Sequence, residues 1–271
     1  MSYFELKSGE KLHYVDTQAG EKTLVLLHGW TSSHQIYLPL MKRLKGRVRC
    51  IAYDQRGHGK SREANRETAS MELLASDLQE LLTGLGLEQV NLLGWSMGAG
   101  VVMTYLKRYG TQRLRSVILC DMTPKQLNDA GWSLGLYKGA YTARQRAADA
   151  EKSFFDLYRE FALAAMPALK RFPRFLLNAE LRKIIQSCDE KVLTDLSASM
   201  KDADNRNCFR GITVPVSYIY ADPGTLFSPK LADWYARQVP SPFRCVKITK
   251  ASHLLMRDQP EQFARAVEAL L

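Results

Sequence analysis

Apolar runs and amphipathic stretches alternate along the first 123 residues of the chain. Short continuous apolar runs are typical of buried strands, and leucines at helical spacing are typical of packed helices. The strands expected from this pattern are Tyr3–Lys7, Lys11–Asp16, Thr23–Leu27, Val48–Tyr53, Gln89–Leu93 and Leu114–Cys120. The helices expected are Met71–Leu85 and Ala99–Leu106. Strands that alternate with helices predict a parallel, doubly wound sheet with functional residues at the strand carboxyl ends.

The alternation stops at residue 124 and resumes near residue 211. The intervening pattern is helical throughout, and it predicts a helical cap over 124–210 inserted between two strands of the sheet. The core domain then comprises 1–123 and 211–271. Its later elements are expected to be strands at Val214–Tyr220 and Arg244–Thr249, with a closing helix at Pro260–Leu271.

The pentapeptide Gly94-Trp95-Ser96-Met97-Gly98 lies between an expected strand and an expected helix. Gly-x-Ser-x-Gly in a strand–turn–helix context is typical of a nucleophilic serine on a strained turn. Glycines flank the serine because a Cβ at either position collides with the neighbouring strand or helix. The positive N-terminal end of the following helix also faces the serine. Ser96 is therefore predicted to be a catalytic nucleophile.

A serine hydroxyl is a weak nucleophile that needs a general base and an orienting acid. In a strand–turn–helix serine hydrolase, both partners follow the serine along the chain. His253 is the one histidine after Ser96, and it lies between the last strand and the closing helix. It is predicted to be the general base. His28, which follows an early strand, is interpreted as a structural brace.

The oxyanion that forms during acyl transfer needs two converging N–H donors. The backbone N–H of Met97 is one candidate, because it follows the nucleophile directly. The backbone N–H of Trp30 is the other, in the loop after the third strand. Gly29, Trp95 and Met122 neighbour these positions and are expected to line the substrate pocket.

These motifs together resemble the α/β-hydrolase superfamily along nearly the whole chain. The resemblance rests on His28-Gly29-Trp30, on the Ser96 turn, on His253, and on Asp54–Ser61, which matches the family's Asp-x-Arg-Gly-x-Gly-x-Ser segment. It implies an α/β-hydrolase fold with a mostly parallel eight-stranded sheet, helices on both faces and an inserted helical cap. It does not specify a substrate.

The resemblance leaves two candidates for the acid. Family members usually carry it after the seventh strand, but Gly224 occupies that position here and Asp222 comes two residues early. Haloalkane dehalogenases of the superfamily carry the acid after strand six and a Pro-Gly after strand seven, and this chain has Asp121 and Pro223-Gly224 there. Asp121 is preferred and Asp222 is the alternative. Dehalogenase and epoxide hydrolase chemistry are disfavoured, since both need an aspartate at the position of Ser96.

The predicted cap is rich in aromatic and apolar side chains, most of which are expected to be core and a few to line an apolar acyl pocket. They are Trp132, Leu136, Tyr137, Tyr141, Phe154, Phe155, Tyr158, Phe161, Met166, Phe172 and Phe175. The cap also carries a basic cluster, Lys170-Arg171-Phe172-Pro173-Arg174, and the chain has a net charge of +10. This charge fits either a solvated surface or an anionic acyl carrier, such as coenzyme A or an acyl-carrier protein.

The sequence contains no dinucleotide fingerprint, phosphate loop or metal-ligand cluster, so no cofactor or metal is expected. Neither a nucleic-acid partner nor a membrane span is expected. The five scattered cysteines and the absence of an apolar leader favour a cytoplasmic protein.

The leading interpretation is a serine hydrolase that cleaves a carboxylic ester, thioester or lactone with an apolar acyl group. An acyltransferase, a cofactor-free lyase and a non-enzymatic ligand-binding protein are the alternatives.

Overall fold

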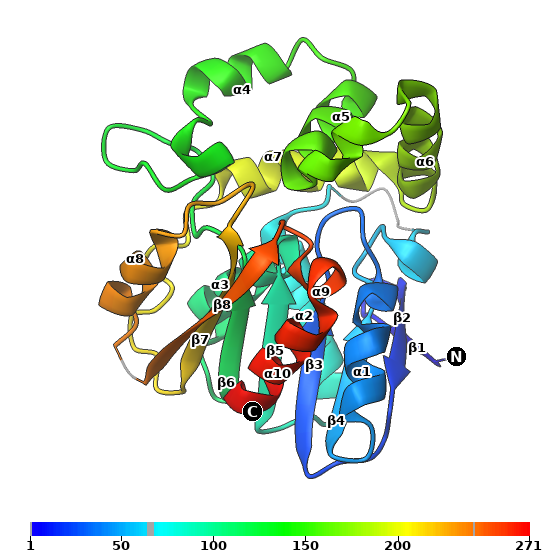
Figure 1. The fold of residues 1–271 in the computed structure, drawn as a ribbon. Helices are drawn as coiled ribbons and strands as arrows, with labels where there is room; N and C mark the ends of the chain where they lie inside the picture. The colour runs from blue at the N-terminus through cyan, green and yellow to red at the C-terminus, as the bar shows by residue number, and fades with distance from the viewer. Residues whose placement is uncertain (1, 64–67, 241) are drawn as a thin grey trace.

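The computed structural model describes residues 2–63, 68–240 and 242–271, and its centre is one eight-stranded sheet (Figure 1). The strands are β1 Ser2–Glu5, β2 Lys11–Asp16, β3 Lys22–Leu27, β4 Val48–Tyr53, β5 Val90–Trp95, β6 Leu114–Cys120, β7 Val216–Pro223 and β8 Phe243–Ala251. Their order is β1-β2-β4-β3-β5-β6-β7-β8. β2 runs antiparallel to both of its neighbours, and the pairs from β4 to β8 are parallel. The predicted mostly parallel eight-stranded sheet is confirmed.

Helices cover both faces of this sheet. Successive side chains of a strand point to opposite faces, so β3 sends Leu24 and Leu26 into one core and Val25 and Leu27 into the other. The first core is completed by α1 (Leu38–Leu44), α9 (Leu255–Asp258) and α10 (Pro260–Leu270). The second is completed by α2 (Met71–Gly84), α3 (Met97–Tyr109) and α8 (Leu231–Gln238). The continuous apolar runs of the central strands follow from this two-sided burial.

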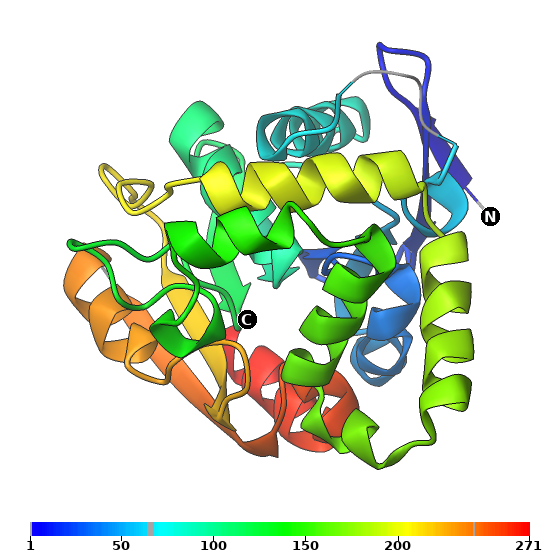
Figure 2. The same cartoon turned by 90° about the horizontal axis from the view of Figure 1, so that it is seen from above.

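Four helices lie between β6 and β7 in the chain: α4 (Ala143–Asp149), α5 (Phe154–Ala165), α6 (Arg174–Gln186) and α7 (Glu190–Asp202). They cover the end of the sheet at which the parallel strands terminate (Figure 1), and Figure 2 shows them from above as a frame over that end. The side chains of Ser153 and Asp189 cap α5 and α7 by accepting from the third amide of each helix.

Residues 124–142 are not helical, and the expectation of helix throughout 124–210 was wrong for this part. The segment folds back on itself, with an isolated bridge between Asn128 and Thr142 and a single 3-10 turn at Tyr137–Gly139. Gly135 permits this fold because a Cβ there would lie 2.2 Å from the carbonyl oxygen of Gln126. The spacing of apolar residues in this segment resembles that of a helix, but its glycines interrupt helical structure.

The aromatic side chains of this segment divide into buried and exposed groups. Tyr141 and Tyr158 are buried, as expected for core residues, whereas Phe172 and Phe175 are 57% and 72% exposed. Phe172 precedes α6 and Phe175 lies in its first turn, and their exposure shows that neither side chain belongs to the core. In the part of the chain that is described, no helix combines the length and apolar character needed to cross a bilayer.

Candidate active site

Ser96 occupies a sharp turn between β5 and α3. Its backbone has φ 54° and ψ −123°, a conformation that L residues rarely adopt and that is found where a site over-determines it. A Cβ on Gly98 would lie 2.2 Å from the carbonyl oxygen of Leu27, and one on Gly94 would lie 2.4 Å from that of Gly98. The two glycines therefore let α3 approach the sheet closely at the Ser96 turn.

His253 lies between Ser96 and Asp121. Its Nε2 is 2.8 Å from Ser96 Oγ, and its Nδ1 is 2.7 Å from Asp121 Oδ2. All three side chains are buried. In the tautomer that satisfies both contacts, Nδ1–H donates to the carboxylate and Nε2 accepts from the serine hydroxyl. This is the geometry in which an imidazole can take the serine proton while a carboxylate holds the ring in place.

The alternative acid, Asp222, lies elsewhere. Its carboxylate is 3.5 Å from the ammonium of Lys247, and both side chains are more than a third exposed. Asp121 instead directly follows β6, where its own N–H donates to the carbonyl of Ile219 on β7. Its φ of 43° turns the backbone sharply at this point. The structure thus brings Asp121, and not Asp222, to His253.

The backbone of the His253 loop is fixed from two sides. The indole N–H of Trp95 donates to the His253 carbonyl at 2.9 Å. The His253 N–H donates to the hydroxyl of Thr225 at 3.1 Å, and that hydroxyl donates to the carbonyl of Ala165 at the end of α5. Sequence reasoning missed Thr225, because a single hydroxyl in a loop belongs to no motif. It ties the histidine loop to the helices above the sheet.

The two expected N–H donors stand next to Ser96. Met97 opens α3, so its N–H is one of the first-turn amides that lack an intrahelical partner. Gly29 packs against Trp95 and Ser96, since a Cβ there would lie 2.8 Å from the Trp95 ring and 3.2 Å from Ser96 Cβ. This contact brings the following Trp30 amide beside the serine, and among the described residues that amide has no hydrogen-bond partner.

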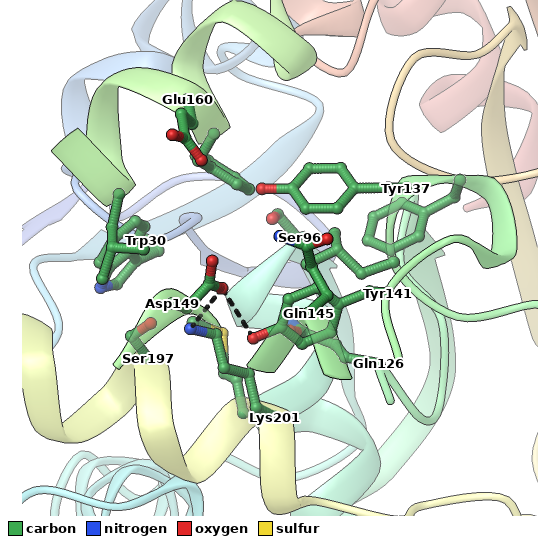
Figure 3. Close-up of a pocket in the computed structure, with 15 residues that line it drawn as sticks. Trp30, Ser96, Gln126, Tyr137, Tyr141, Gln145, Asp149, Glu160, Ser197 and Lys201 are labelled. Carbon is green, nitrogen blue, oxygen red and sulfur yellow. Dashed lines mark hydrogen bonds and ion pairs between the residues drawn. The ribbon is translucent and has the colours of Figure 1, made fainter. Parts of the chain in front are cut away.

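Two cavities meet at Ser96, and both also contact Trp30 and Phe161. The larger, of about 260 Å³, extends under α4, α5 and α7 (Figure 3). The smaller, of about 170 Å³, contains His253 and Trp95 and is mostly apolar. Trp95 thus lines a cavity as expected. Gly29 and Met122 line neither, because Gly29 is covered by its neighbours and Met122 is buried, where its carbonyl accepts from Tyr235.

The larger cavity is apolar near Ser96 and polar at its far end. Near the serine, the indole of Trp30 meets Phe161 of α5 edge-on, with ring centroids 5.6 Å apart. At the far end, Asp149 accepts from the Tyr141 hydroxyl at 2.9 Å and lies 3.8 Å from the ammonium of Lys201 (Figure 3). The cavity thus differs from the expected apolar acyl pocket, because Asp149, Glu160 and Lys201 also line it.

Desolvation perturbs the charged groups of this polar end. Burial lowers the pKa of Lys201, although the nearby Asp149 carboxylate opposes the effect. Burial also raises the pKa of Tyr137, whose hydroxyl faces Asp149 and Glu160. Tyr137 has a φ of 54°, a strained value for an aromatic residue. Backbone strain and shifted pKa values are both common at functional sites, and here they occur in the same cavity.

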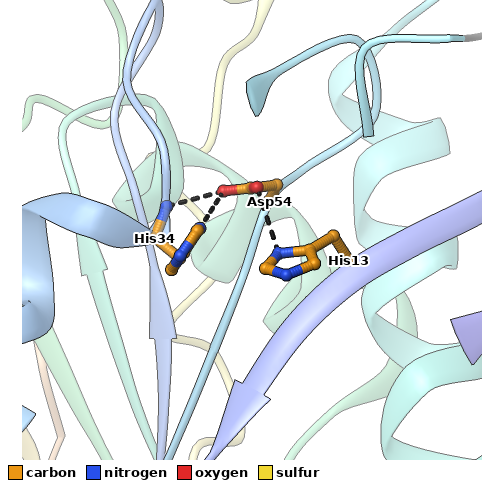
Figure 4. A group of neighbouring side chains, drawn as sticks. All are labelled: His13, His34 and Asp54. Atoms are coloured by element: carbon orange, nitrogen blue, oxygen red, sulfur yellow. Dashed lines mark hydrogen bonds and ion pairs between the residues drawn. The ribbon is translucent and has the colours of Figure 1, made fainter. Parts of the chain in front are cut away.

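In a second buried cluster, His13, His34 and Asp54, the atoms that could ligate a metal lie within 4.8 Å of one another (Figure 4). One Asp54 oxygen accepts from the backbone N–H and the Nδ1 of His34 at 2.7 and 2.8 Å, and the other accepts from the N–H of Lys60 at 3.0 Å. Burial alone raises the pKa of Asp54, but these hydrogen bonds bring it below its ordinary value. With backbone N–H groups directed at both oxygens, the cluster braces two loops and offers a cation little access.

His28 and the 54–61 loop form a further brace. The Nε2 of His28 accepts from the N–H of Gln55 at 2.9 Å, and its carbonyl accepts from the Gln55 side chain. Burial lowers the pKa of His28. Burial is also the largest cause that lowers the pKa of His58, to about 3, and the proximity of His28 adds to the effect. Both shifts favour the neutral imidazole, which suits a structural role. The loop also contacts α7, because the Asp189 N–H donates to the carbonyl of Gly57.

Comparison with known proteins places the chain in one family. The model of the alpha/beta hydrolase family matches residues 24–266. The pimeloyl-acyl-carrier protein methyl ester esterase of Nitrosomonas europaea is 24% identical over 95% of this chain and 98% of its own. The non-heme chloroperoxidase CPO-A1 of Kitasatospora aureofaciens is 35% identical, but the match spans only 44% of this chain and 42% of the chloroperoxidase.

Solved structures of similar fold include the esterase EaEST from Exiguobacterium antarcticum, with a TM-score of 0.84 and 22% identity over 99% of this chain and 98% of that one. The enol-lactonase from Burkholderia xenovorans has a TM-score of 0.77 at 22% identity, covering 99% of this chain and 98% of the other. At these identities the likeness concerns the fold alone. Since the family model spans most of the chain, the protein belongs to the alpha/beta hydrolase family, as its sequence motifs predicted.

Proposed function

We propose that this hydrolase cleaves a carboxylic ester through an acyl-serine intermediate, with thioesters and lactones as chemically adjacent substrates. The observation that carries the proposal is the continuous hydrogen-bonded chain from Ser96 Oγ through His253 to Asp121, with contacts of 2.8 and 2.7 Å. A buried hydrogen-bonded series of serine, histidine and aspartate activates the serine hydroxyl at neutral pH. The relatives of this protein include methyl ester esterases, which agrees with this chemistry.

In the acylation step, Ser96 Oγ attacks the carbonyl carbon while His253 Nε2 takes its proton. Asp121 keeps the ring in the productive tautomer and stabilises the imidazolium that forms. The developing oxyanion is stabilised by the backbone N–H groups of Trp30 and Met97 and by the positive end of α3. His253 then gives its proton to the leaving oxygen, and the carbon–oxygen bond breaks.

In the deacylation step, water replaces the leaving alcohol beside His253. The imidazole removes a proton from the water, the hydroxide attacks the acyl carbon, and the proton passes to Ser96 Oγ as the acid leaves. The base therefore serves both half-reactions from one position. The indole of Trp95 and the hydroxyl of Thr225 hold the His253 backbone in that position.

The two cavities divide the substrate between them. His253 must protonate the leaving group, so the leaving group has to lie beside its ring. The smaller cavity contains His253, whereas the larger contacts Ser96 without it. We therefore assign the smaller, apolar cavity to the leaving alcohol and the larger one to the acyl group.

We further propose that residues 124–210 act as a cap. Helices α4, α5 and α7 of this segment supply most of the wall of the larger cavity, so they exclude bulk water from Ser96. The indole N–H of Trp30 donates to the carbonyl of Leu193 in α7, which fastens the cap to the oxyanion loop.

A reducing compartment such as the cytoplasm suits the chain, since Cys50, Cys120, Cys188, Cys208 and Cys245 are free.

The test is hydrolysis of a p-nitrophenyl ester series, from short to long acyl chains, by the wild type and Ser96→Ala. The proposal expects turnover that is lost in Ser96→Ala, and an acyl-serine detectable by intact-protein mass spectrometry when the wild type is quenched. The preferred chain length reports the size of the larger cavity. Turnover without an acyl-serine would favour a lyase mechanism, and activity that survives the substitution would overturn the proposal.

A carrier-borne ester is the second candidate substrate. The methyl ester esterase relatives from Nitrosomonas europaea and Vibrio vulnificus align with 95% and 93% of this chain. Lys170, Arg171 and Arg174 are close in sequence and exposed on the proposed cap, and they are candidates to contact an anionic carrier such as coenzyme A or an acyl-carrier protein. Such a substrate predicts a kcat/KM that falls with added salt, while a neutral ester responds little. An equal response of both would exclude it.

A further inference from the structure

The far end of the larger cavity holds an ammonium group with unused hydrogen-bonding capacity. Lys201 projects from α7 into this cavity, and its side chain is 18% exposed. The nearest carboxylate oxygen, on Asp149, is 3.8 Å away, which is beyond hydrogen-bond distance. Within the described residues, no acceptor lies within hydrogen-bond distance of its Nζ. An ammonium has three N–H donors, so those of Lys201 are available to a group that enters the cavity.

The carboxylates around Lys201 are already occupied. Asp149 Oδ2 accepts from the hydroxyl of Tyr141, and Asp149 Oδ1 lies 3.4 Å from the ammonium of Lys152. Lys152 also donates to Glu160 at 2.6 Å. Since Asp149 already binds two donors, it offers little to a cationic ligand. The donors of Lys201 thus remain available to a ligand in this part of the cavity.

The charge balance of the lining selects the kind of ligand group that Lys201 can bind. Asp149 and Glu160 both line the cavity with Lys201, so a ligand carboxylate near its ammonium would also face two carboxylates. A ligand ammonium would face Lys201 itself. An uncharged oxygen avoids both repulsions and still accepts a hydrogen bond from Lys201, which is stronger than a bond between two neutral groups.

We infer that the acyl group of the substrate ends in an uncharged hydrogen-bond acceptor, such as an amide, ketone or hydroxyl oxygen, and that Lys201 binds this group. The inference rests on the proposed function, because it requires the acyl group to occupy the larger cavity. Trp30 and Phe161 contact the apolar part of the chain next to Ser96, and Lys201 contacts its polar end. The substrate class is therefore a polar-ended acyl ester and not a simple fatty ester.

The experiment compares two p-nitrophenyl esters of the chain length that the wild type hydrolyses best. One ends in a primary carboxamide and the other in an isopropyl group, so the two end groups are similar in size and differ in hydrogen bonding. We expect kcat/KM to be about tenfold higher for the carboxamide, the ratio typical of a hydrogen bond to a charged group. A third ester, ending in a carboxylate, is expected to be poorer than the carboxamide.

Lys201→Met keeps an unbranched side chain that is one atom shorter and removes the donors, and it should bring the carboxamide-to-isopropyl ratio close to 1. Lys183→Met is the matched control, since Lys183 is an exposed lysine of α6 that pairs with Glu180, and it should keep the wild-type ratio. Thermal melts establish that each variant is folded. The wild-type ratio tests the inference by itself should Lys201→Met fail to fold.

The outcomes separate the two proposals. Absence of Ser96-dependent turnover of any of these esters would overturn the proposed function. Ser96-dependent turnover with equal rates for the carboxamide and isopropyl esters would overturn the inference alone. So would a preference that persists in Lys201→Met, or a carboxylate ester that is hydrolysed best.

Discussion

The backbone of Asp121 is strained and its side chain is buried, as expected of a residue held in one position at a functional site. Its φ is 43°, its carboxylate is buried, and Oδ2 lies 2.7 Å from His253 Nδ1. Asp222 offers a partly exposed carboxylate that pairs with Lys247. At the scale of single residues, the site thus distinguishes two aspartates that the sequence had left as alternatives.

We predict that Asp121→Asn lowers kcat for the best p-nitrophenyl ester by about 10⁴-fold, as loss of the corresponding carboxylate does in serine proteases. The asparagine NH2 can donate to Nδ1, which favours the tautomer with its proton on Nε2, so the ring no longer accepts the proton of Ser96. Asp222→Asn is the matched control and should leave kcat within about twofold, because surface ion pairs contribute little. Steady-state kinetics of both variants decide the matter, and a larger loss in Asp222→Asn would reverse the assignment.

Residue roles were predictable where a motif or chain order carries them. Ser96 and His253 were identified by a pentapeptide and by position, and the structure brings their side chains to 2.8 Å. Thr225 and Lys201 were missed, because a hydroxyl in a loop and a lysine on an amphipathic helix have no local signature. Their positions depend on how the cap packs over the sheet, which is a property of tertiary structure.

The strand–turn–helix unit of β5 and α3 depends on close backbone contact. A Cβ on Gly98 would lie 2.2 and 2.8 Å from the carbonyl oxygens of Leu27 and His28. These are backbone atoms of β3 and the loop after it, and they cannot move without shifting a central strand. The glycine is thus a packing requirement at the scale of elements, and it also fixes the Ser96 turn.

We predict that Gly98→Ala destabilises the protein by about 1–3 kcal/mol, the usual cost of overpacking a tight interface. It should also lower esterase activity, because α3 must move away from β3 and carries the Met97 N–H with it. Gly131→Ala is the control, since a Cβ there meets only a side-chain oxygen of Asp129 at an ordinary 3.5 Å. Urea unfolding measures both, and equal midpoints for the two variants would contradict the argument.

Strand positions were predictable from apolar runs because the sheet is buried on both faces. The bounds expected for Val48–Tyr53 and Leu114–Cys120 match β4 and β6. The expectation of helix over 124–142 was wrong, because the segment folds back so that Gly135 packs against the Gln126 carbonyl, and hydrophobic periodicity does not detect such a backbone contact. The pattern thus identified elements held by hydrophobic burial and failed where a loop is held by backbone contacts.

The whole molecule contains several histidines held neutral in its interior, and these couple its stability to pH. His13, His28 and His58 are fully buried, and burial is the largest cause that lowers the pKa of each. Unfolding returns each ring to an ordinary pKa of about 6.5. Below that pH the unfolded chain binds protons that the folded chain does not, so the free energy of unfolding falls as the pH falls.

His58 gives this argument a magnitude. Its folded pKa is about 3, so its contribution is fully present above pH 6.5 and is lost progressively down to the folded value. The loss is about 1.4 kcal/mol per pH unit, or about 2 kcal/mol between pH 6.5 and pH 5. The paired aspartates lose their contribution below the unfolded carboxyl pKa of about 4. The window from pH 6.5 to 5 therefore reports the histidines.

We predict that the free energy of unfolding of the wild type, measured by urea denaturation, declines steadily from pH 7 to pH 5. His58→Asn replaces the ring with an uncharged amide that still donates to the Arg56 carbonyl, as Nδ1 does at 2.9 Å. The variant is less stable at pH 7 because it leaves a small cavity, but it should decline by about 2 kcal/mol less over the window. The slope and not the level is the measured quantity. Parallel curves for the two proteins would mean that His58 does not control the acid sensitivity of this fold.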